Sequence, residues 1–410
     1  MAGPRSRQFS GWPLLAHSFR LFFLLAAVQA ALSILVWLPV FYGELSVSSA
    51  FAPRDWHVHE MLYGFLPAVV TGFLFTAIPN WTGRLPLQGT PLVTLAVVWL
   101  AGRIAVTVSA DVGWAFALAV DAAFLALVVA AAVREIAAGK NWRNLPVVML
   151  VLMLLAGNVA FHLEAHFEGA ADYSIRIGIA VIVILLSLIG GRIIPSFTRN
   201  WLVKENPGRL PVPFGRFDGI VIGLTALSLI SWIASPLSTA TGVAMGLIGA
   251  LHLVRLARWA GDRTTRERLL LILHIGYAFV PFGFLLNAAA SFGVLPPSAG
   301  IHAWMAGAAG TMTLAVMTRA SLGHTGQALK ASVATQVIYA AIITAALARV
   351  CAVVHPESSQ ALLHVAAFCW ITAYAGFVIA FGPLLMGSKW HGLATVRAVV
   401  PPRGQASPAR

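Results

Sequence analysis

The stretch LFFLLAAVQAALSILVWLPVF at residues 21–41 contains no ionisable side chain and is long enough to cross a lipid bilayer as one helix. Arg5 and Arg7 precede it, as basic residues precede the apolar core of a signal peptide, but this apolar run is longer than such a core. We therefore interpret it as a first membrane span that is not cleaved.

Similar apolar runs recur along the whole chain. The 410 residues are 59% hydrophobic and only 10% charged, whereas a soluble domain carries roughly 25% charged residues. Turn and charge signals divide the apolar runs into twelve predicted spans, near residues 17–41, 57–80, 91–109, 111–134, 144–168, 174–197, 217–235, 238–260, 267–292, 298–320, 330–354 and 360–386. The sequence thus predicts an all-α polytopic membrane protein with one transmembrane domain at 17–386, an N-terminal segment at 1–16 and a tail at 387–410.

The loops between these spans alternate in charge. Basic loops, for example those with Arg84, Arg199 and Lys204, alternate with loops that are poor in Lys and Arg. Positively charged loops face the cytoplasm of a bacterial inner membrane, so both termini are predicted to be cytoplasmic. Because the net charge of +13 is dispersed over these loops, we expect no nucleic-acid partner, which would need a basic patch.

The second, sixth and tenth spans end in similar segments. These are TAIPNWTGR (76–84), IPSFTR (194–199) and VMTR (316–319). The interval of four helices suggests that the domain consists of three four-helix units.

Half of the twelve histidines are predicted to lie in one layer near the periplasmic surface: His57, His59, His162, His166, His302 and His364. A buried histidine is often only a hydrogen-bonded packing residue. Several histidines at one depth on separate helices favour a metal or haem site instead, because the neutral imidazole is a common ligand for both.

The spacing of these histidines suggests which of them act together. His162 and His166 are four residues apart, so they share a helix face and suit copper or zinc, and a solvated His166 at the helix end is an equal alternative. His57 and His59 point to nearly opposite sides of a helix and should serve different partners, and both are metal candidates. One nitrogen per helix suffices for an axial haem ligand, so His59 with His302 is the expected bis-histidine pair.

A second set of ionisable residues is predicted at the cytoplasmic side: His17, His252, His274, His324, Arg20, Arg192 and Arg319. Arginine pairs with haem propionates or other anions. Arg192, Arg319 and His324 are therefore candidates for cofactor binding, while for most of this set a contact with lipid headgroups or a helix end is the simpler interpretation.

Five segments of the chain resemble the NnrS family. They are HSFRLFFL (17–24), WHVHEMLYGF (56–65), FLFTAIPNWTGR (73–84), GGRIIPSFTRN (190–200) and HAWMAGAAGTMTLAVMTRASLGHTG (302–326). The chain has Leu21 where the family commonly has proline, and Arg20 beside it is kept.

The resemblance implies a bacterial inner-membrane protein that carries haem b and copper and acts in the response to nitric oxide and in denitrification. It carries over the motif positions His57, His59, Glu60, Arg192, His302, Arg319 and His324, together with His162. The implied partners are nitric oxide or a related small molecule, the lipid bilayer and a membrane electron donor. Binding and redox turnover of nitric oxide both remain open, and no catalytic residue is assigned.

Three other protein classes can be compared with this pattern of spans and histidines. Twelve spans with histidines on the second and tenth also resemble haem-copper oxidases, but the sixth and seventh spans lack the histidines that hold copper there. Twelve spans and repeats are common in secondary transporters as well, which would have a polar site at the membrane midplane and no visible cofactor. A metal-delivery protein is the third alternative, and its metal would be exchangeable.

Overall fold

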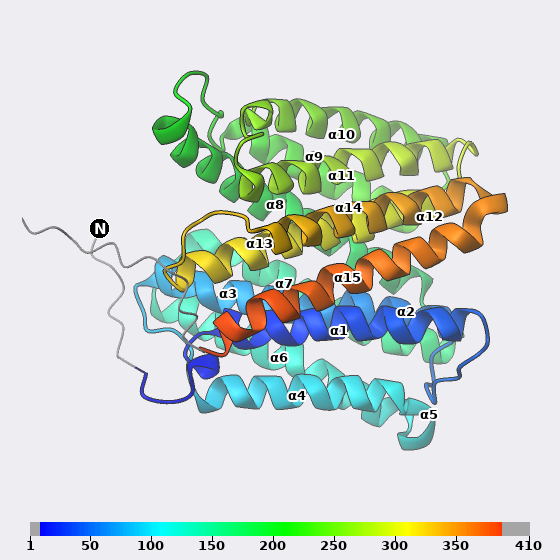
Figure 1. The fold of residues 1–410 in the computed structure, drawn as a ribbon. Helices are drawn as coiled ribbons and strands as arrows, with labels where there is room; N and C mark the ends of the chain where they lie inside the picture. Colours follow the sequence, from blue (N-terminus) through cyan, green and yellow to red (C-terminus); the bar gives the residue numbers. More distant parts are fainter. Residues whose placement is uncertain (1–8, 388–410) are drawn as a thin grey trace, which may run out of the picture.

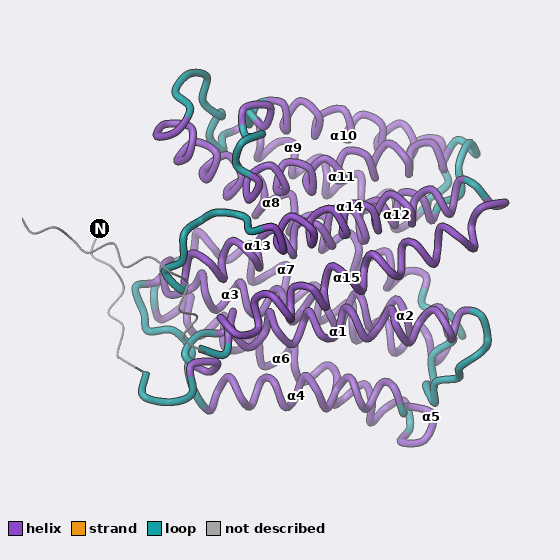
Figure 2. The backbone as a smooth tube through the Cα atoms, in the orientation of Figure 1, coloured by secondary structure: helices purple, strands orange, loops and turns teal. Residues whose placement is uncertain are grey.

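The computed structural model describes residues 9–387, so residues 1–8 and the predicted tail beyond Gly387 lie outside it. Within the described residues the chain forms helices and connecting loops, with no strand (Figure 2). The helices lie roughly side by side in one bundle (Figure 1). The predicted class, an all-α polytopic membrane protein, is confirmed.

Eleven helical segments between residues 9 and 387 are long and apolar enough to cross a membrane. The remaining predicted span, near 298–320, is the continuous helical run α12 (Ser298–His302), a π-helical segment (Ala303–Ala309) and α13 (Gly310–His324). This run is rich in Gly and Thr and is mostly buried against α11, α14 and α15. Because protein rather than lipid surrounds it, it needs less hydropathy than the other spans.

The helices fall into three consecutive units of four. The first contains α1 (Ser18–Phe41), the run α2 (Pro53–His59), π-segment (Glu60–Phe65) and α3 (Leu66–Thr82), then α4 (Thr90–Thr107) and α6 (Trp114–Ala138), with the short α5 (Ser109–Val112) between the last two. The second contains α7 (Leu145–Phe167), α8 (Asp172–Glu205), α9 (Arg216–Ala234) and α10 (Thr239–Ala257). The third contains α11 (Arg268–Ser291), the run α12 to α13, α14 (Val333–Val354) and α15 (Ser359–Leu385).

The same contacts recur in each unit. The first helix packs on the second and the third packs on the fourth, as α1 on α3, α4 on α6, α7 on α8, α9 on α10 and α14 on α15. The fourth helix of each unit packs on the first helix of the next, and α15 returns to α1. The three units therefore close into a ring, as the four-helix interval in the sequence suggests.

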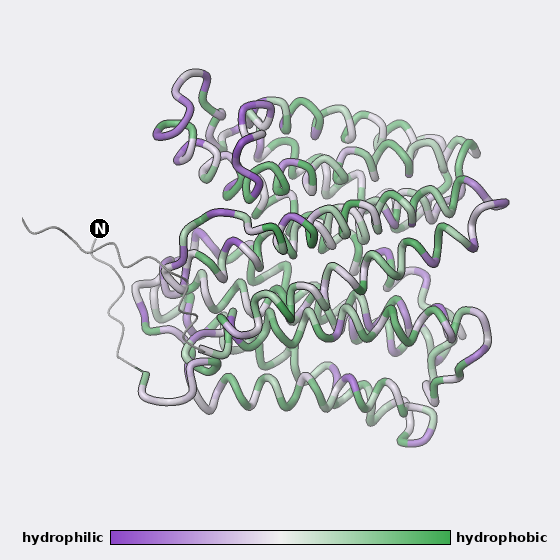
Figure 3. Tube along the Cα trace, in the orientation of Figure 1, coloured by the Kyte–Doolittle hydropathy of each residue, from purple (hydrophilic) through white to green (hydrophobic). Residues whose placement is uncertain are grey.

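Local sequence signals set the helix ends. Pro53 opens α2 at a position where a missing N–H costs nothing, and the Ser332 side chain accepts a hydrogen bond from Thr335 N–H at the start of α14. Gly83 ends α3 with a φ of +71°, a conformation that glycine adopts without strain, and its N–H bonds to the Pro79 carbonyl. Hydrophobic residues follow the helices, and hydrophilic ones gather in the loops (Figure 3).

We call the two ends of the bundle after the charge prediction. The outer end carries the starts of α2, α12 and α15 and the end of α7, and the inner end carries the ends of α3 and α13. The second helix of each unit is among the most buried, and four of the five motif segments quoted above lie on these helices. Both π-helical segments follow a motif histidine directly, His59 in one case and His302 in the other. Such segments are frequent at functional sites.

Candidate metal centre

Three buried side chains from three helices converge in the outer half of the first unit and its neighbour α7. His59 ends α2, Asp121 lies on α6 and His162 lies on α7, and one ligand atom from each lies within 4.8 Å of the others. Nε2 of both histidines is 3.2 Å from Oδ2 of Asp121. Donor atoms bound to one ion at about 2.1 Å in a tetrahedral arrangement are about 3.4 Å apart, so these separations suit a shared metal ion.

A second layer of polar groups holds this His–Asp–His cluster in place. Asn158 donates its Nδ2–H to Oδ2 of Asp121 at 2.8 Å, and its Oδ1 lies 2.9 Å from Nε2 of His59. The other oxygen of Asp121 pairs with Arg103 from α4. Partners of this kind orient metal ligands and tune their basicity.

Arg103 links the cluster to a second buried carboxylate. Its Nη1 donates to Oε1 of Glu60 at 2.6 Å, and Gln29 donates to Oε2 of Glu60 at 2.5 Å. With neutral imidazoles, the two carboxylates and the single guanidinium leave one net negative charge in a buried site. Buried charges are expected to be compensated, and a bound cation or a protonated imidazole would do so.

Aromatic rings close the cluster off from the surrounding lipid. The ring of Phe161 is 5.0 Å from that of His59, and the ring of Phe51 is 5.0 Å from that of His162. Tyr63 covers His59 from the π-helical segment and donates its hydroxyl to the Ser174 carbonyl at 3.0 Å. The His–Asp–His cluster is therefore shielded from its surroundings, and electrostatic interactions are stronger in such a buried site than in water.

His57 faces away from this cluster, as its spacing from His59 predicts. Its ring stacks on Trp37 of α1 at 4.4 Å, and its Nδ1 is buried with no hydrogen-bond partner among the described residues. His57 is within electrostatic range of His302 and of Arg349, and Arg349 is also within range of His302.

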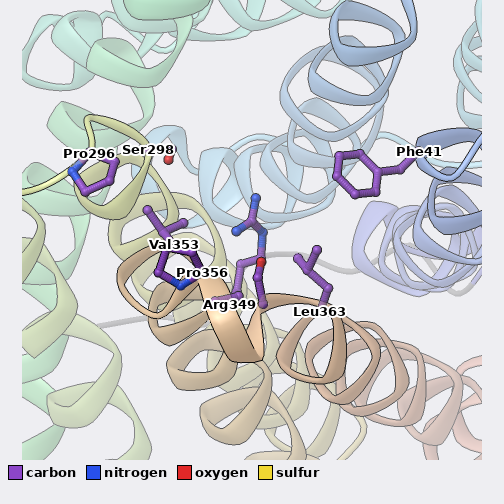
Figure 4. A pocket seen from close by; sticks show the side chains of 9 residues that line it. Phe41, Pro296, Ser298, Arg349, Val353, Pro356 and Leu363 are labelled. Atoms are coloured by element: carbon purple, nitrogen blue, oxygen red, sulfur yellow. The ribbon is translucent and has the colours of Figure 1, made fainter.

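His302 is oriented in the way that a ligand histidine often is. Its Nδ1–H donates to the carbonyl of Ser298 at 2.7 Å, which leaves the Nε2 lone pair free. Arg349 of α14 forms no hydrogen bond or ion pair within residues 9–387, and it lines a cavity of about 500 Å³ together with Ser298. In Figure 4 the guanidinium extends between Val353 on one side and Phe41 and Leu363 on the other.

The two remaining outer histidines lie apart from both groups. His166 is exposed and stacks on Trp114 at 4.1 Å, so it does not join the His–Asp–His cluster with His162. His364 is exposed, stacks on Tyr42 and donates its Nδ1–H to the Gln360 carbonyl at 2.8 Å. The structure also places His59 with Asp121 and His162, while His302 lies near His57.

A family model described as NnrS protein matches residues 13–389, which is nearly the whole chain. The chain belongs to the NnrS family. No functionally curated protein matches it. The match covers every helix from α1 to α15. It includes both outer histidine groups of this NnrS chain, which are the His–Asp–His cluster and the pair of His57 and His302.

At the inner end, the NnrS chain brings three sequence candidates together. Arg192 of α8 and Arg319 and His324 of α13 line one cavity of about 550 Å³. The other inner residues have partners elsewhere: His274 bonds to Thr198, and Arg20 donates to the carbonyls of Leu384 and Leu385.

His252 belongs to a separate buried network of the NnrS chain, between α9, α10 and α11. Its ring nitrogens lie 3.0 Å from the Thr225 hydroxyl and 2.9 Å from the Tyr277 hydroxyl. Next to it, Arg255 forms a buried ion pair with Asp218 at 2.7 Å.

Sequence reasoning centred on histidine missed four residues of these sites: Asp121, Arg103, Asn158 and Arg349. A signal for three of them was present, because an ionisable side chain inside an apolar span is expensive and marks a functional site by default. Asn158 carries no charge, and nothing in the sequence distinguishes it from an ordinary polar residue of a membrane helix.

Proposed function

We propose that this NnrS-type protein binds copper and haem b in the bacterial inner membrane and acts in the response to nitric oxide. The buried His–Asp–His cluster of His59, Asp121 and His162 carries the proposal, because its donor atoms, spacing and charge suit a transition-metal cation. Copper and haem iron both bind nitric oxide and exchange electrons.

In this proposal the His–Asp–His cluster holds the copper. Arg103 and Asn158 hold Asp121 in position through an ion pair and a hydrogen bond, and Glu60 pairs with Arg103. A monovalent copper ion would bring the net charge of the site to zero.

The haem is assigned to the region between α2 and α12. His57 and His302 offer ring nitrogens without a protein partner, and they replace His59 and His302 as the expected pair because His59 faces Asp121. Arg349 supplies a positive charge for a propionate, the acid group for which arginine is the usual partner.

Absorption spectra and metal analysis of the purified protein in detergent test both assignments. We expect a Soret band with haem, and copper in proportion to protein. His57→Ala and His302→Ala should remove the haem spectrum and leave copper, whereas His59→Ala and His162→Ala should remove copper. His364→Ala is the matched control, since this histidine lies at the same end and is exposed.

The outcomes separate the proposal from its alternatives. A protein that contains neither haem nor copper would overturn it and favour a transporter. Copper that exchanges freely with chelators, without haem, would favour metal delivery.

A further inference from the structure

The inner-end cavity lies where the second helices of all three units meet. Trp81 of α3, Arg192 of α8 and Arg319 of α13 line it, so each unit contributes a wall. Its volume of about 550 Å³ is large enough for a small ligand. Ligand sites often form where structural repeats meet within a membrane protein.

The charges in this cavity are not balanced by protein. Within residues 9–387, no carboxylate pairs with Arg192 or Arg319, and no acidic residue lines the cavity. Among the described residues, the only hydrogen bond of Arg192 is a long one of 3.4 Å to Asn144 Oδ1, and the guanidinium carbon of Arg319 lies 4.5 Å from the centre of the Phe197 ring. Glu267 lies within electrostatic range of Arg319, but its carboxylate caps α11 by accepting a hydrogen bond from the Leu269 N–H.

Most of the remaining lining is apolar, and it also contains the polar side chains of Thr76, Asn80, Asn144 and His324. The apolar side chains come from several helices: Phe23, Phe73, Val147, Ile189, Ile193, Leu273 and Val316. Two guanidinium groups without an acidic partner, in one cavity whose lining is mostly apolar, suit a ligand that is charged at one end and apolar at the other.

We propose that this cavity binds an amphiphilic anion, with its carboxylate or phosphate between Arg192 and Arg319 and its apolar body against Phe73 and Ile189. The bilayer supplies such a group as the phosphate of an anionic lipid, and haem supplies it as a propionate. This site is separate from the outer histidine groups, so it does not rest on their metal content.

The lipid arm of the test uses the fluorescence of Trp81 in the cavity wall. The protein and its Trp81→Phe variant are reconstituted in vesicles of brominated phosphatidylglycerol or brominated phosphatidylcholine, and the difference between the two proteins reports the quenching of Trp81. We expect the anionic lipid to be preferred by about fivefold for each arginine. Arg192→Gln with Arg319→Gln should abolish the preference, and Arg199→Gln, an exposed arginine on the same helix outside the cavity, should keep it.

The haem arm counts haem per chain in the same variants by the pyridine haemochrome spectrum. Loss of haem in the double variant, with haem retained in His57→Ala, would identify the amphiphile as haem, and it would contradict the haem assignment to His57 and His302 while this proposal stands. Selective quenching without loss of haem would identify a lipid. If Trp81 is quenched equally by both lipids in the unmutated protein, and the double variant holds as much haem as Arg199→Gln, the proposal is overturned.

Discussion

Gly64 lies directly against the side chain of Arg103: a Cβ at position 64 would come within 2.6 Å of Nη1 of Arg103. That nitrogen is bonded to Glu60, and Nη2 is bonded to Asp121, so the guanidinium has no free direction in which to move. The absence of a side chain at position 64 is thus what lets α4 reach the two buried carboxylates.

We therefore expect Gly64→Ala to destabilise the protein and to lower its metal content. Overpacking of a buried site costs roughly 1–3 kcal/mol, and here the displaced group is charged. Thermal unfolding in detergent and metal analysis measure the two effects. Gly223→Ala is the control, because a Cβ on this α9 residue meets nothing within 4 Å, and equal behaviour of the two variants would contradict the role given to Gly64.

Asp121→Asn tests the metal site itself. The variant keeps the shape of the side chain but removes its charge, so metal affinity should fall by at least tenfold, since even partners of metal ligands contribute about 10–100-fold. Asp218→Asn breaks the other buried ion pair, that with Arg255. It should destabilise the protein to a similar extent, by roughly 3–5 kcal/mol, while metal content stays unchanged. Loss of metal from both variants would mean that unfolding, not coordination, explains the result.

The sequence was sufficient to predict the helical class and the four-helix interval, because long apolar runs and repeated motifs are local signals. It also placed His57 and His59 on different sides of one helix, which the structure confirms through Trp37 and Asp121. Which residues meet across helices depends on helix rotation, and no local signal records that. The partner of His59 is therefore Asp121 on α6, a contact that only the packed bundle establishes.

The same reasoning explains why His162 and His166 do not act as a pair. Their spacing places both on one helix face, but α7 ends near His166, and its ring lies on Trp114 at the protein surface. A spacing of four residues would allow His162 and His166 to bind one metal ion. At the end of α7, however, the ring of His166 lies on Trp114 instead.

Arg349→Gln tests the haem assignment through a reduction potential. A positive charge near haem favours the reduced state, so its removal should lower the midpoint potential, by on the order of 50 mV for a tenfold change in the equilibrium. A redox titration followed at the Soret band measures this shift. Arg199→Gln, at the other end of the bundle, should leave the potential unchanged. An unchanged potential in Arg349→Gln would place the haem away from α14.

His17, which precedes α1, gives a prediction about pH. Burial lowers its pKa, and the nearby charges of Arg20 and His324 lower it further. The folded protein therefore holds this imidazole neutral, whereas the unfolded chain titrates near its usual pKa of about 6.5. Protons bind the unfolded state more readily, so the stability that the neutral His17 contributes is fully present above pH 6.5 and is lost as the pH drops below it.

The melting temperature of His17→Gln should decline less on acidification than that of the unmodified protein. The melting temperature of the exposed-site variant His355→Gln should decline as much as that of the unmodified protein. Parallel declines in all three proteins would show that His17 does not contribute to acid sensitivity.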